Sequence, residues 1–268
     1  MAKIIKKVLL CPPKYFRVRY QINPWMKAAD QVNQSQAQQQ WLKLTSLYSQ
    51  LGIKVTTIKP KPDLPDMIFT ADQGLIENSS VILANFRFKQ RQPETKIYQQ
   101  WFKKQRFKIL TLPKNLYFEG GDVLKIGKKI ITGYGFRTSY QTPQAISKLL
   151  KTPVTSLRLI NPYFYHLDTC LLALSPREAF YYPNAFDQAS QKKLAQLFPK
   201  LIPFTKKEAF SLAANSISTD HQVIIPNSAT TLAKKLGQLG YETFPTKVSE
   251  FIKAGGGIRC LTITTKTD

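Results

Sequence analysis

The sequence predicts an α/β fold in which five similar units form a closed ring. Three observations support this prediction. A strand-like segment, an amphipathic helix and a short apolar segment recur in that order five times along the chain. A strand-like segment remains at the C-terminus, and its pairing with the first unit would close the ring and remove exposed sheet edges. No Gly/Ser-rich linker or change in composition divides the chain, so residues 1–268 are predicted to form a single domain.

Each unit is expected to open with strand sequence, at Ile4–Leu10, Met67–Phe86, Tyr117–Thr132, His166–Tyr182 and Phe210–Ile225. Apolar residues at helical spacing then predict helices over Gln34–Gln50, Pro93–Gln105, Thr142–Leu150, Asp187–Phe198 and Ala229–Leu239. A short apolar strand follows each helix, at Ile53–Ile58, Phe107–Leu112, Val154–Ile160, Leu201–Phe204 and Tyr241–Phe244. The β-branched run of Arg259–Thr265 is the strand that should complete the first unit.

The net charge is +23, and lysine supplies most of it, because only nine of the 39 basic residues are arginine. Such a charge could attract nucleic acid or anionic surfaces. The lysine pairs are spread over predicted helix faces and turns, without the alternation of basic and aromatic residues typical of nucleic-acid modules. A solvated cationic surface is therefore the favoured interpretation, and specific nucleic-acid binding is not.

Three cysteines, with no CxxC spacing and no metal-ligand pattern with the two histidines, favour a reduced, cytoplasmic protein that needs no metal. The chain contains no apolar run long enough to span a membrane. The N-terminal apolar stretch is too short for a signal peptide and is interpreted as a strand. The sequence is compatible with a homodimer and does not predict the oligomeric state.

Near the C-terminus, Gly255-Gly256-Gly257 precedes Ile258-Arg259-Cys260 and a predicted strand. Glycines permit positive φ angles and close approach of the backbone to a ligand. A cysteine held on a rigid support beside bare backbone is a candidate nucleophile. The alternative is a small apolar residue packed at the start of a strand.

Acidic residues follow or interrupt apolar strand sequence in two places. Asp72 lies between an apolar segment and Gly74, where it could face a cation or form a surface turn. Glu119 and Asp122 flank Gly120-Gly121 between hydrophobic residues, which indicates at least one buried acid with a partner. A hairpin with solvated acids is the alternative.

His166 and Asp168 alternate along a predicted strand and should therefore share one face, as an acid–base element requires. A buried histidine without a catalytic role is the alternative. Asn23, in a loop shaped by Pro24, could donate to a ligand or simply form a turn. Arg137 lies on a glycine-flanked loop, whereas His221 resembles a hairpin turn and is given no role.

Taken together, Glu119-Gly-Gly-Asp, His166-Leu-Asp-Thr and the terminal Gly-Gly-Ile-Arg-Cys260 resemble the guanidino-group modifying enzymes. That superfamily includes arginine deiminases, dimethylarginine dimethylaminohydrolases and amidinotransferases. The segments Cys11-Pro-Pro and Ile22-Asn-Pro-Trp-Met are similar to the catalytic domain of bacterial arginine dihydrolases. The resemblance covers nearly the whole chain and implies a five-fold α/β propeller (the pentein fold), closed by the C-terminal strand, as a catalytic domain.

The resemblance also implies a chemistry. Cys260 would attack the guanidinium carbon and form a covalent S-alkylthiouronium intermediate, with His166 as general acid and then general base. Asp72 and Asp168 would bind the guanidinium, and Glu119 would bind it and help to move protons. Arg137 and Arg87 would hold the substrate's α-carboxylate, and no cofactor is implied.

Two features narrow the predicted reaction. Dihydrolase relatives usually have Asn where this chain has Asp72, and Glu119 in place of Asp disfavours an amidinotransferase. The prediction is therefore a dimethylargininase-like or deiminase-like hydrolase that produces citrulline from a small guanidino substrate. An arginine dihydrolase producing ornithine is the nearest alternative. A basic ring that binds nucleic acid or ribosomes is the non-enzymatic one, and a papain-like enzyme is disfavoured because His166 precedes Cys260.

Overall fold

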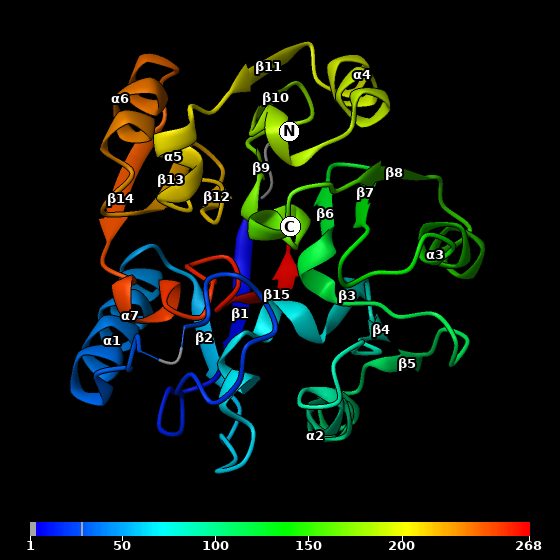
Figure 1. Ribbon diagram of the computed structural model, residues 1–268, viewed down its shortest axis with the longest axis vertical. Helices are drawn as coiled ribbons and strands as arrows, with labels where there is room; N and C mark the ends of the chain where they lie inside the picture. The colour runs from blue at the N-terminus through cyan, green and yellow to red at the C-terminus, as the bar shows by residue number, and fades with distance from the viewer. Residues whose placement is uncertain (1–3, 28) are drawn as a thin grey trace.

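The computed structural model describes residues 4–27 and 29–268. It contains five three-stranded sheets around a central axis, here called blades 1 to 5 (Figure 1). From the inner strand outwards, blade 1 is β15 (Ile263–Thr267), β1 (Ile5–Leu10) and β2 (Lys54–Thr57), and blade 2 is β3 (Gly74–Glu77), β4 (Ser80–Leu83) and β5 (Lys108–Leu110). Blade 3 is β6 (Val123–Ile126), β7 (Lys129–Tyr134) and β8 (Val154–Arg158). Blade 4 is β9 (Leu171–Ala173), β10 (Glu178–Tyr181) and β11 (Lys200–Pro203), and blade 5 is β12 (Ile217–Thr219), β13 (Gln222–Pro226) and β14 (Glu242–Thr246).

All five blades share one topology, in which the inner and middle strands pair antiparallel and the middle and outer strands pair parallel. A parallel pair needs a crossover, and one helix supplies it in each blade. These helices are α1 (Gln34–Gln50), α2 (Gln92–Lys104), α3 (Thr142–Leu150), α4 (Gln188–Leu197) and α6 (Thr230–Gln238). They lie at the outer rim of the ring (Figure 1).

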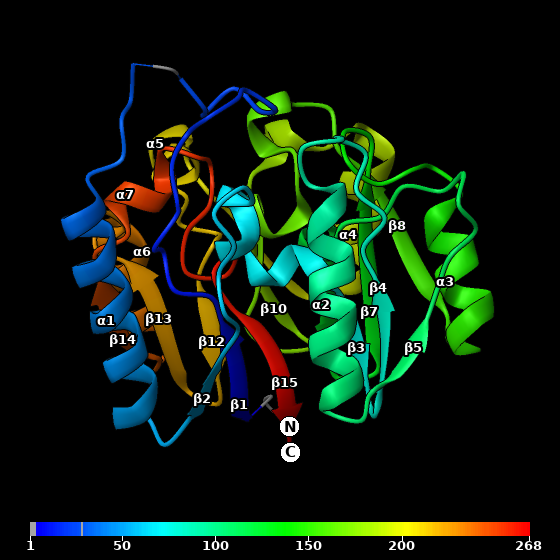
Figure 2. The same ribbon diagram turned by 90° about the horizontal axis from the view of Figure 1, so that it is seen from below.

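The C-terminal strand closes the ring as predicted, because β15 pairs antiparallel with β1. The end of β15 lies beside the start of β1 at one end of the axis, and loops gather at the opposite end (Figure 2). One prediction was wrong in detail. The strand starts at Ile263, and Arg259 and Cys260 belong to a turn before it.

The helices pack through apolar residues four positions apart, which share a helix face. Such pairs are Leu44 and Tyr48 in α1, Tyr98 and Phe102 in α2, and Leu232 and Leu236 in α6, all fully buried. The five predicted helices end within one residue of the observed bounds. Two short helices, α5 (Lys206–Phe210) and α7 (Ser249–Ile252), come before β12 and β15 respectively. None of the helices among the described residues has the length and hydropathy that a membrane crossing requires.

Candidate active site

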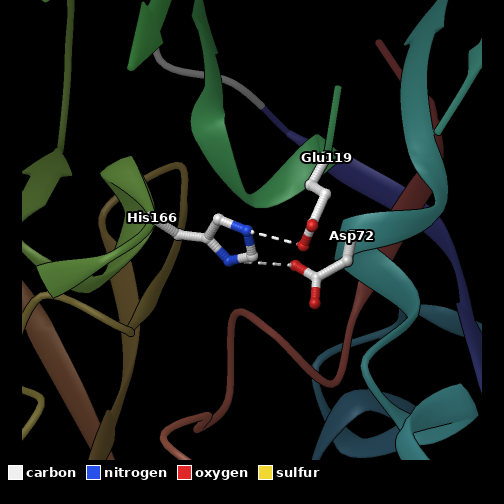
Figure 3. Close-up of side chains that lie close together, drawn as sticks. All are labelled: Asp72, Glu119 and His166. Carbon is white, nitrogen blue, oxygen red and sulfur yellow. Dashed lines mark hydrogen bonds and ion pairs between the residues drawn. The ribbon is translucent and has the colours of Figure 1, made fainter. Parts of the chain in front are cut away.

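Short turns immediately before the inner strands bring polar side chains to the axis. In blade 2 the 3-10 turn Thr70–Gln73 carries Asp72, and in blade 3 Glu119 precedes the turn Gly120–Asp122. In blade 4 His166 precedes the turn Leu167–Thr169, which carries Asp168. Figure 3 shows that Asp72, Glu119 and His166 come from three separate segments and point toward one another. Residues about 50 positions apart along the chain therefore meet, because each lies in the segment that leads into the inner strand of its blade.

The imidazole of His166 lies between two carboxylates. Its Nε2 is 3.0 Å from Glu119 Oε2, and its Nδ1 is 3.4 Å from Asp72 Oδ1. Burial alone would lower the pKa of His166, but the charges of Asp72, Glu119 and Asp122 and the bond to Glu119 outweigh burial and raise that pKa to about 9. His166 is therefore an imidazolium at neutral pH, with a proton available for a leaving amine.

Two buried arginines hold these carboxylates in place. Arg91 Nη1 donates to Asp72 Oδ2 at 2.6 Å, and Arg137 Nη1 donates to Glu119 Oε2 at 2.9 Å. Burial would raise the pKa of Glu119, but Arg137, His166 and Arg91 together lower it to about 2. Each arginine is 2% exposed. Glu119 thus stays ionised over the whole range in which the protein is expected to work.

The predicted arginines lie in different environments. Arg137 is in the site, where its second nitrogen donates to Ile22 O at 3.0 Å and its guanidinium lies over the ring of Tyr165. Arg87 is exposed and lies 5.0 Å from the centre of the Tyr117 ring, outside the cluster of acids. The α-carboxylate role of both residues stays a prediction.

Sequence reasoning missed Arg91, which is the arginine that contacts Asp72. Arg91 also bonds both oxygens of Glu94, at 3.1 and 2.9 Å. Glu94 is fully buried on α2, and burial raises its pKa to about 7 against the opposing effect of Arg91. The spacing of three residues between Arg91 and Glu94 at the start of a helix was the available signal.

The sulfur of Cys260 lies beside the fourth blade. Its Sγ is 3.7 and 3.8 Å from the two carboxylate oxygens of Asp168, and the side-chain amide of Asn215 donates to it at 3.0 Å. Burial, together with the charges of Asp168 and Asp72, raises the pKa of this thiol well above its usual value. Burial also raises the pKa of Asp168, to about 7. A cation bound between the sulfur and the acids would reverse both effects and favour the thiolate.

The prediction that His166 and Asp168 share a strand face was wrong. His166 has extended backbone and Asp168 lies in the 3-10 turn that follows it, so the two side chains leave the chain in different directions. His166 contacts the acids of blades 2 and 3, whereas Asp168 contacts Cys260. This one segment of blade 4 therefore supplies the imidazole on one side of the site and the carboxylate beside the sulfur on the other. His221 lies in the turn between β12 and β13, as expected.

Two glycines show why bare backbone is needed here. A Cβ atom at Gly121 would lie 2.6 Å from both Asp72 Oδ1 and His166 Nδ1, inside contact distance. Gly255 adopts a φ of +83°, a conformation that other residues rarely adopt. The glycines thus permit the acids and the imidazole to approach and the nucleophile loop to turn.

The side chain of Asn23 makes hydrogen bonds within the protein. Its Oδ1 accepts from the backbone N–H groups of Trp25 and Met26, at 2.9 and 3.2 Å. Its Nδ2 donates to Ala254 O at 3.1 Å, so Asn23 joins its own turn to the loop that leads to Cys260. A direct contact between Asn23 and a ligand stays a prediction.

The site is built for a cation that brings several hydrogen-bond donors. Glu119 Oε1 is buried without a hydrogen bond among the described residues, and buried Asp72 Oδ1 has only the ion pair with His166 Nδ1 at 3.4 Å. Atoms of Asp72, Glu119 and His166 lie within 4.8 Å of one another, close enough to hold a metal ion. However, a protonated His166 offers no lone pair, and Arg91 already places a positive charge beside Asp72. A planar guanidinium, with N–H donors and one delocalised charge, fits these carboxylate acceptors better than a divalent metal ion does.

Comparison with known proteins agrees with this chemistry. Residues 12–266 match the sequence model of the family described as eukaryotic N,N dimethylarginine dimethylhydrolase. The chain is 37% identical to N(G),N(G)-dimethylarginine dimethylaminohydrolase of Mycobacterium tuberculosis, over 96% of this chain and 85% of that protein. It is 39% identical to the bifunctional arginine dihydrolase/ornithine cyclodeaminase ArgZ of Synechocystis sp., over 96% of this chain and 37% of that protein.

Solved structures show the same arrangement of the chain. The product-bound N-terminal domain of ArgZ superposes with a TM-score of 0.94 at 38% identity, covering 98% of both chains. The citrulline complex of the Pseudomonas aeruginosa dimethylaminohydrolase superposes with a TM-score of 0.83 at 20% identity, covering 97% of this chain and 99% of that one, and supports the fold alone. The predicted five-fold α/β propeller is thereby confirmed.

The fold and these relationships define a guanidino-group modifying enzyme, as the sequence motifs predicted. Within that superfamily, the chain belongs to the dimethylarginine dimethylaminohydrolase family. The prediction of a hydrolase that acts on guanidino C–N bonds is confirmed at the level of the family. The chain spans 37% of the length of the bifunctional ArgZ, and the match lies in the N-terminal domain of that protein.

Proposed function

We propose that this chain hydrolyses the guanidinium group of arginine-type amino acids, with dimethylarginine as the preferred substrate and citrulline as the product. The single observation that carries the proposal is a pair of buried carboxylate oxygens that no hydrogen bond occupies: Glu119 Oε1 has no partner among the described residues, and Asp72 Oδ1 has only the ion pair with His166 Nδ1 at 3.4 Å. A guanidinium can donate to both while its carbon faces Cys260. Family membership supports the same substrate class.

Cys260 is the proposed nucleophile. Binding of the cation beside Asp168 favours loss of the thiol proton, because the cation offsets the carboxylate charges that raise the thiol pKa. The thiolate then attacks the guanidinium carbon and forms a C–S bond. His166 gives its proton to the nitrogen that leaves, and the C–N bond breaks to release a neutral amine.

The second half of the reaction uses the same groups in reverse. The neutral imidazole of His166 accepts a proton from water, and the hydroxide formed attacks the carbon of the thiouronium intermediate. The C–S bond breaks and the sulfur leaves as a thiolate, and the new hydroxyl group loses its proton to solvent, so that neutral citrulline is released. Glu119, held by Arg137, keeps His166 oriented through both steps.

Charge explains why the reaction is expected to stop at citrulline. The carboxylates of Asp72, Glu119 and Asp168 stabilise a cation, and the ureido group of citrulline is neutral. A neutral ureido group gains no charge–charge attraction from these carboxylates, so citrulline should bind more weakly than a guanidinium. Asp72 adds one negative charge where an amide side chain would add none.

Arginine dihydrolase activity is the second candidate, because the chain is 39% identical to ArgZ over 263 residues. Incubation with dimethylarginine, arginine and agmatine, followed by mass spectrometry, separates the candidates. We expect citrulline with dimethylamine as the main product and no ornithine, and no turnover by Cys260→Ser. Ornithine from the wild-type protein would overturn the proposed reaction in favour of the dihydrolase.

A further inference from the structure

The fifth blade also presents a polar side chain at the axis. Asn215 lies two residues before β12, as Asp72 lies two residues before β3. The other blades place functional residues in the same leading segment but not at the same position: Glu119 lies four residues before β6, His166 five before β9 and Cys260 three before β15. The repeat therefore places Asn215 among the functional residues, although the residue carries no charge and belongs to no motif identified in the sequence.

All four hydrogen bonds that this amide can make are formed. Its Oδ1 accepts from the backbone N–H groups of Gly257 and Cys260, at 2.9 and 3.1 Å. Its Nδ2 donates to Asp168 O at 3.2 Å and to Cys260 Sγ at 3.0 Å. Asn215 is fully buried, so water does not compete for these bonds. One side chain thus joins blade 5, the nucleophile loop and blade 4.

The hydrogen bond from Asn215 to the sulfur favours the thiolate form of Cys260. The carboxylate of Asp168 lies 3.7 Å from Sγ and opposes a negative charge there. The Nδ2–H of Asn215 approaches the same sulfur and favours that charge, and the backbone N–H of Gly257 acts in the same direction. A hydrogen bond to a charged group is stronger than one between neutral groups. The amide therefore supports the reactive form of the sulfur without adding a second charge to the crowded site.

We propose that Asn215 is the positioning residue of the nucleophile. Its carbonyl oxygen fixes the loop that carries Cys260, and its amide nitrogen stabilises the thiolate by a hydrogen bond. The inference rests on the proposed function in one respect, namely that Cys260 is the nucleophile. In this proposal Asn215 affects the ionisation and the position of the Cys260 sulfur, and it does not take part in recognition of the guanidinium.

The test uses Asn215→Asp, which keeps the shape and the two accepting contacts but replaces the donor to sulfur by an anionic oxygen. The probe is 2-chloroacetamidine, which has a planar cationic amidinium group; the thiolate attacks its CH2 carbon, a C–S bond forms, and the C–Cl bond breaks with loss of chloride. The first-order inactivation constant kinact is measured against pH, and mass spectrometry of peptides locates the adduct. This readout needs neither a leaving amine nor attacking water, so it does not depend on turnover.

Asn85→Asp is the matched control, because the Asn85 amide also donates two hydrogen bonds, to Lys114 O and Leu116 O, and neither acceptor belongs to the loop that carries Cys260. We expect kinact of Asn215→Asp at neutral pH to fall by about 10- to 100-fold, the value of one hydrogen bond to a charged group. The rise of kinact should also move to higher pH by about one unit or more. The control should react as the wild type does.

An unchanged pH profile with wild-type kinact in a folded Asn215→Asp protein would overturn the inference. A uniform loss at every pH, without a shift of the profile, would overturn the assigned bond to the thiolate. If Cys260 reacts as expected in both proteins and yet no guanidino amino acid is hydrolysed by the wild type, the proposed function fails and the role of Asn215 stands. Circular dichroism melting shows whether each variant is folded.

Discussion

Replacing Glu119 by Gln tests how the site keeps His166 protonated. Glu119 accepts from His166 at 3.0 Å and contributes both a bond and a charge to the raised pKa of that imidazole. An opposite charge at this distance is worth about 1–3 pKa units. The glutamine keeps the shape but not the charge, so the pKa of His166 should fall from about 9 toward 7.

The expected loss follows from the fraction of imidazolium. At pH 8 a group with a pKa of 9 is about 90% protonated, and one with a pKa of 7 is about 10% protonated. The variant should therefore lose about tenfold in kcat at pH 8 from ionisation alone, and the alkaline limb of its pH–rate profile should move to lower pH. If the substitution also changes the orientation of the imidazole, the loss in kcat will be larger than tenfold.

Nitrogen-15 NMR can follow the imidazole directly, because the chain has two histidines and His221 is an exposed turn residue. Glu178→Gln is the control, since Glu178 also bonds a cation and a second side chain, Lys200 and Tyr241, away from the site. A His166 titration that is the same in Glu119→Gln and in the wild type would refute the reasoning.

Further predictions follow from the same geometry. The pH profile of kcat/KM should be bell-shaped, rising through a pKa of about 7 as Asp168 ionises and falling through a pKa of about 9 as His166 loses its proton. A profile without the acid limb would contradict the role of Asp168. Gly121→Ala should lower kcat/KM by about 100-fold or more, because its Cβ would lie 2.6 Å from atoms of Asp72 and His166. Gly237→Ala, in the exposed interior of α6 with no atom within 4 Å of the new Cβ, should leave kcat/KM unchanged and stabilise the protein by about 0.5–1 kcal/mol in urea unfolding.

The five-fold repetition could be predicted because each unit carries its own local signals. Apolar residues four positions apart define the helices, and capping residues such as Asn33 and Asp187 define where two of them begin. The pairing of β15 with β1 followed from one strand being left over. The helix features depend on neighbouring residues, and the ring closure depends on the count of the units; a single sequence contains both.

The fine structure of the site could not be predicted in the same way. A 3-10 turn such as Leu167–Thr169 has only three residues and no period, so its apolar flanks resembled a strand. The contact of Arg91 with Asp72 joins a residue beside a helix start to a turn 19 positions earlier, and the local spacing of Arg91 and Glu94 does not indicate that second partner. Asn215 fell within the predicted strand-like segment Phe210–Ile225, and only the contacts of the folded chain with Asp168 and the Cys260 loop indicate a role.

The most direct test of the account is to trap the covalent intermediate. The protein is mixed with dimethylarginine, quenched in acid within one turnover and digested, and the peptide that contains each of the three cysteines is weighed. We predict an adduct on Cys260 equal in mass to the substrate less dimethylamine, and none on Cys11 or Cys170. Turnover that persists in Cys260→Ser, or an adduct on another residue, would contradict it.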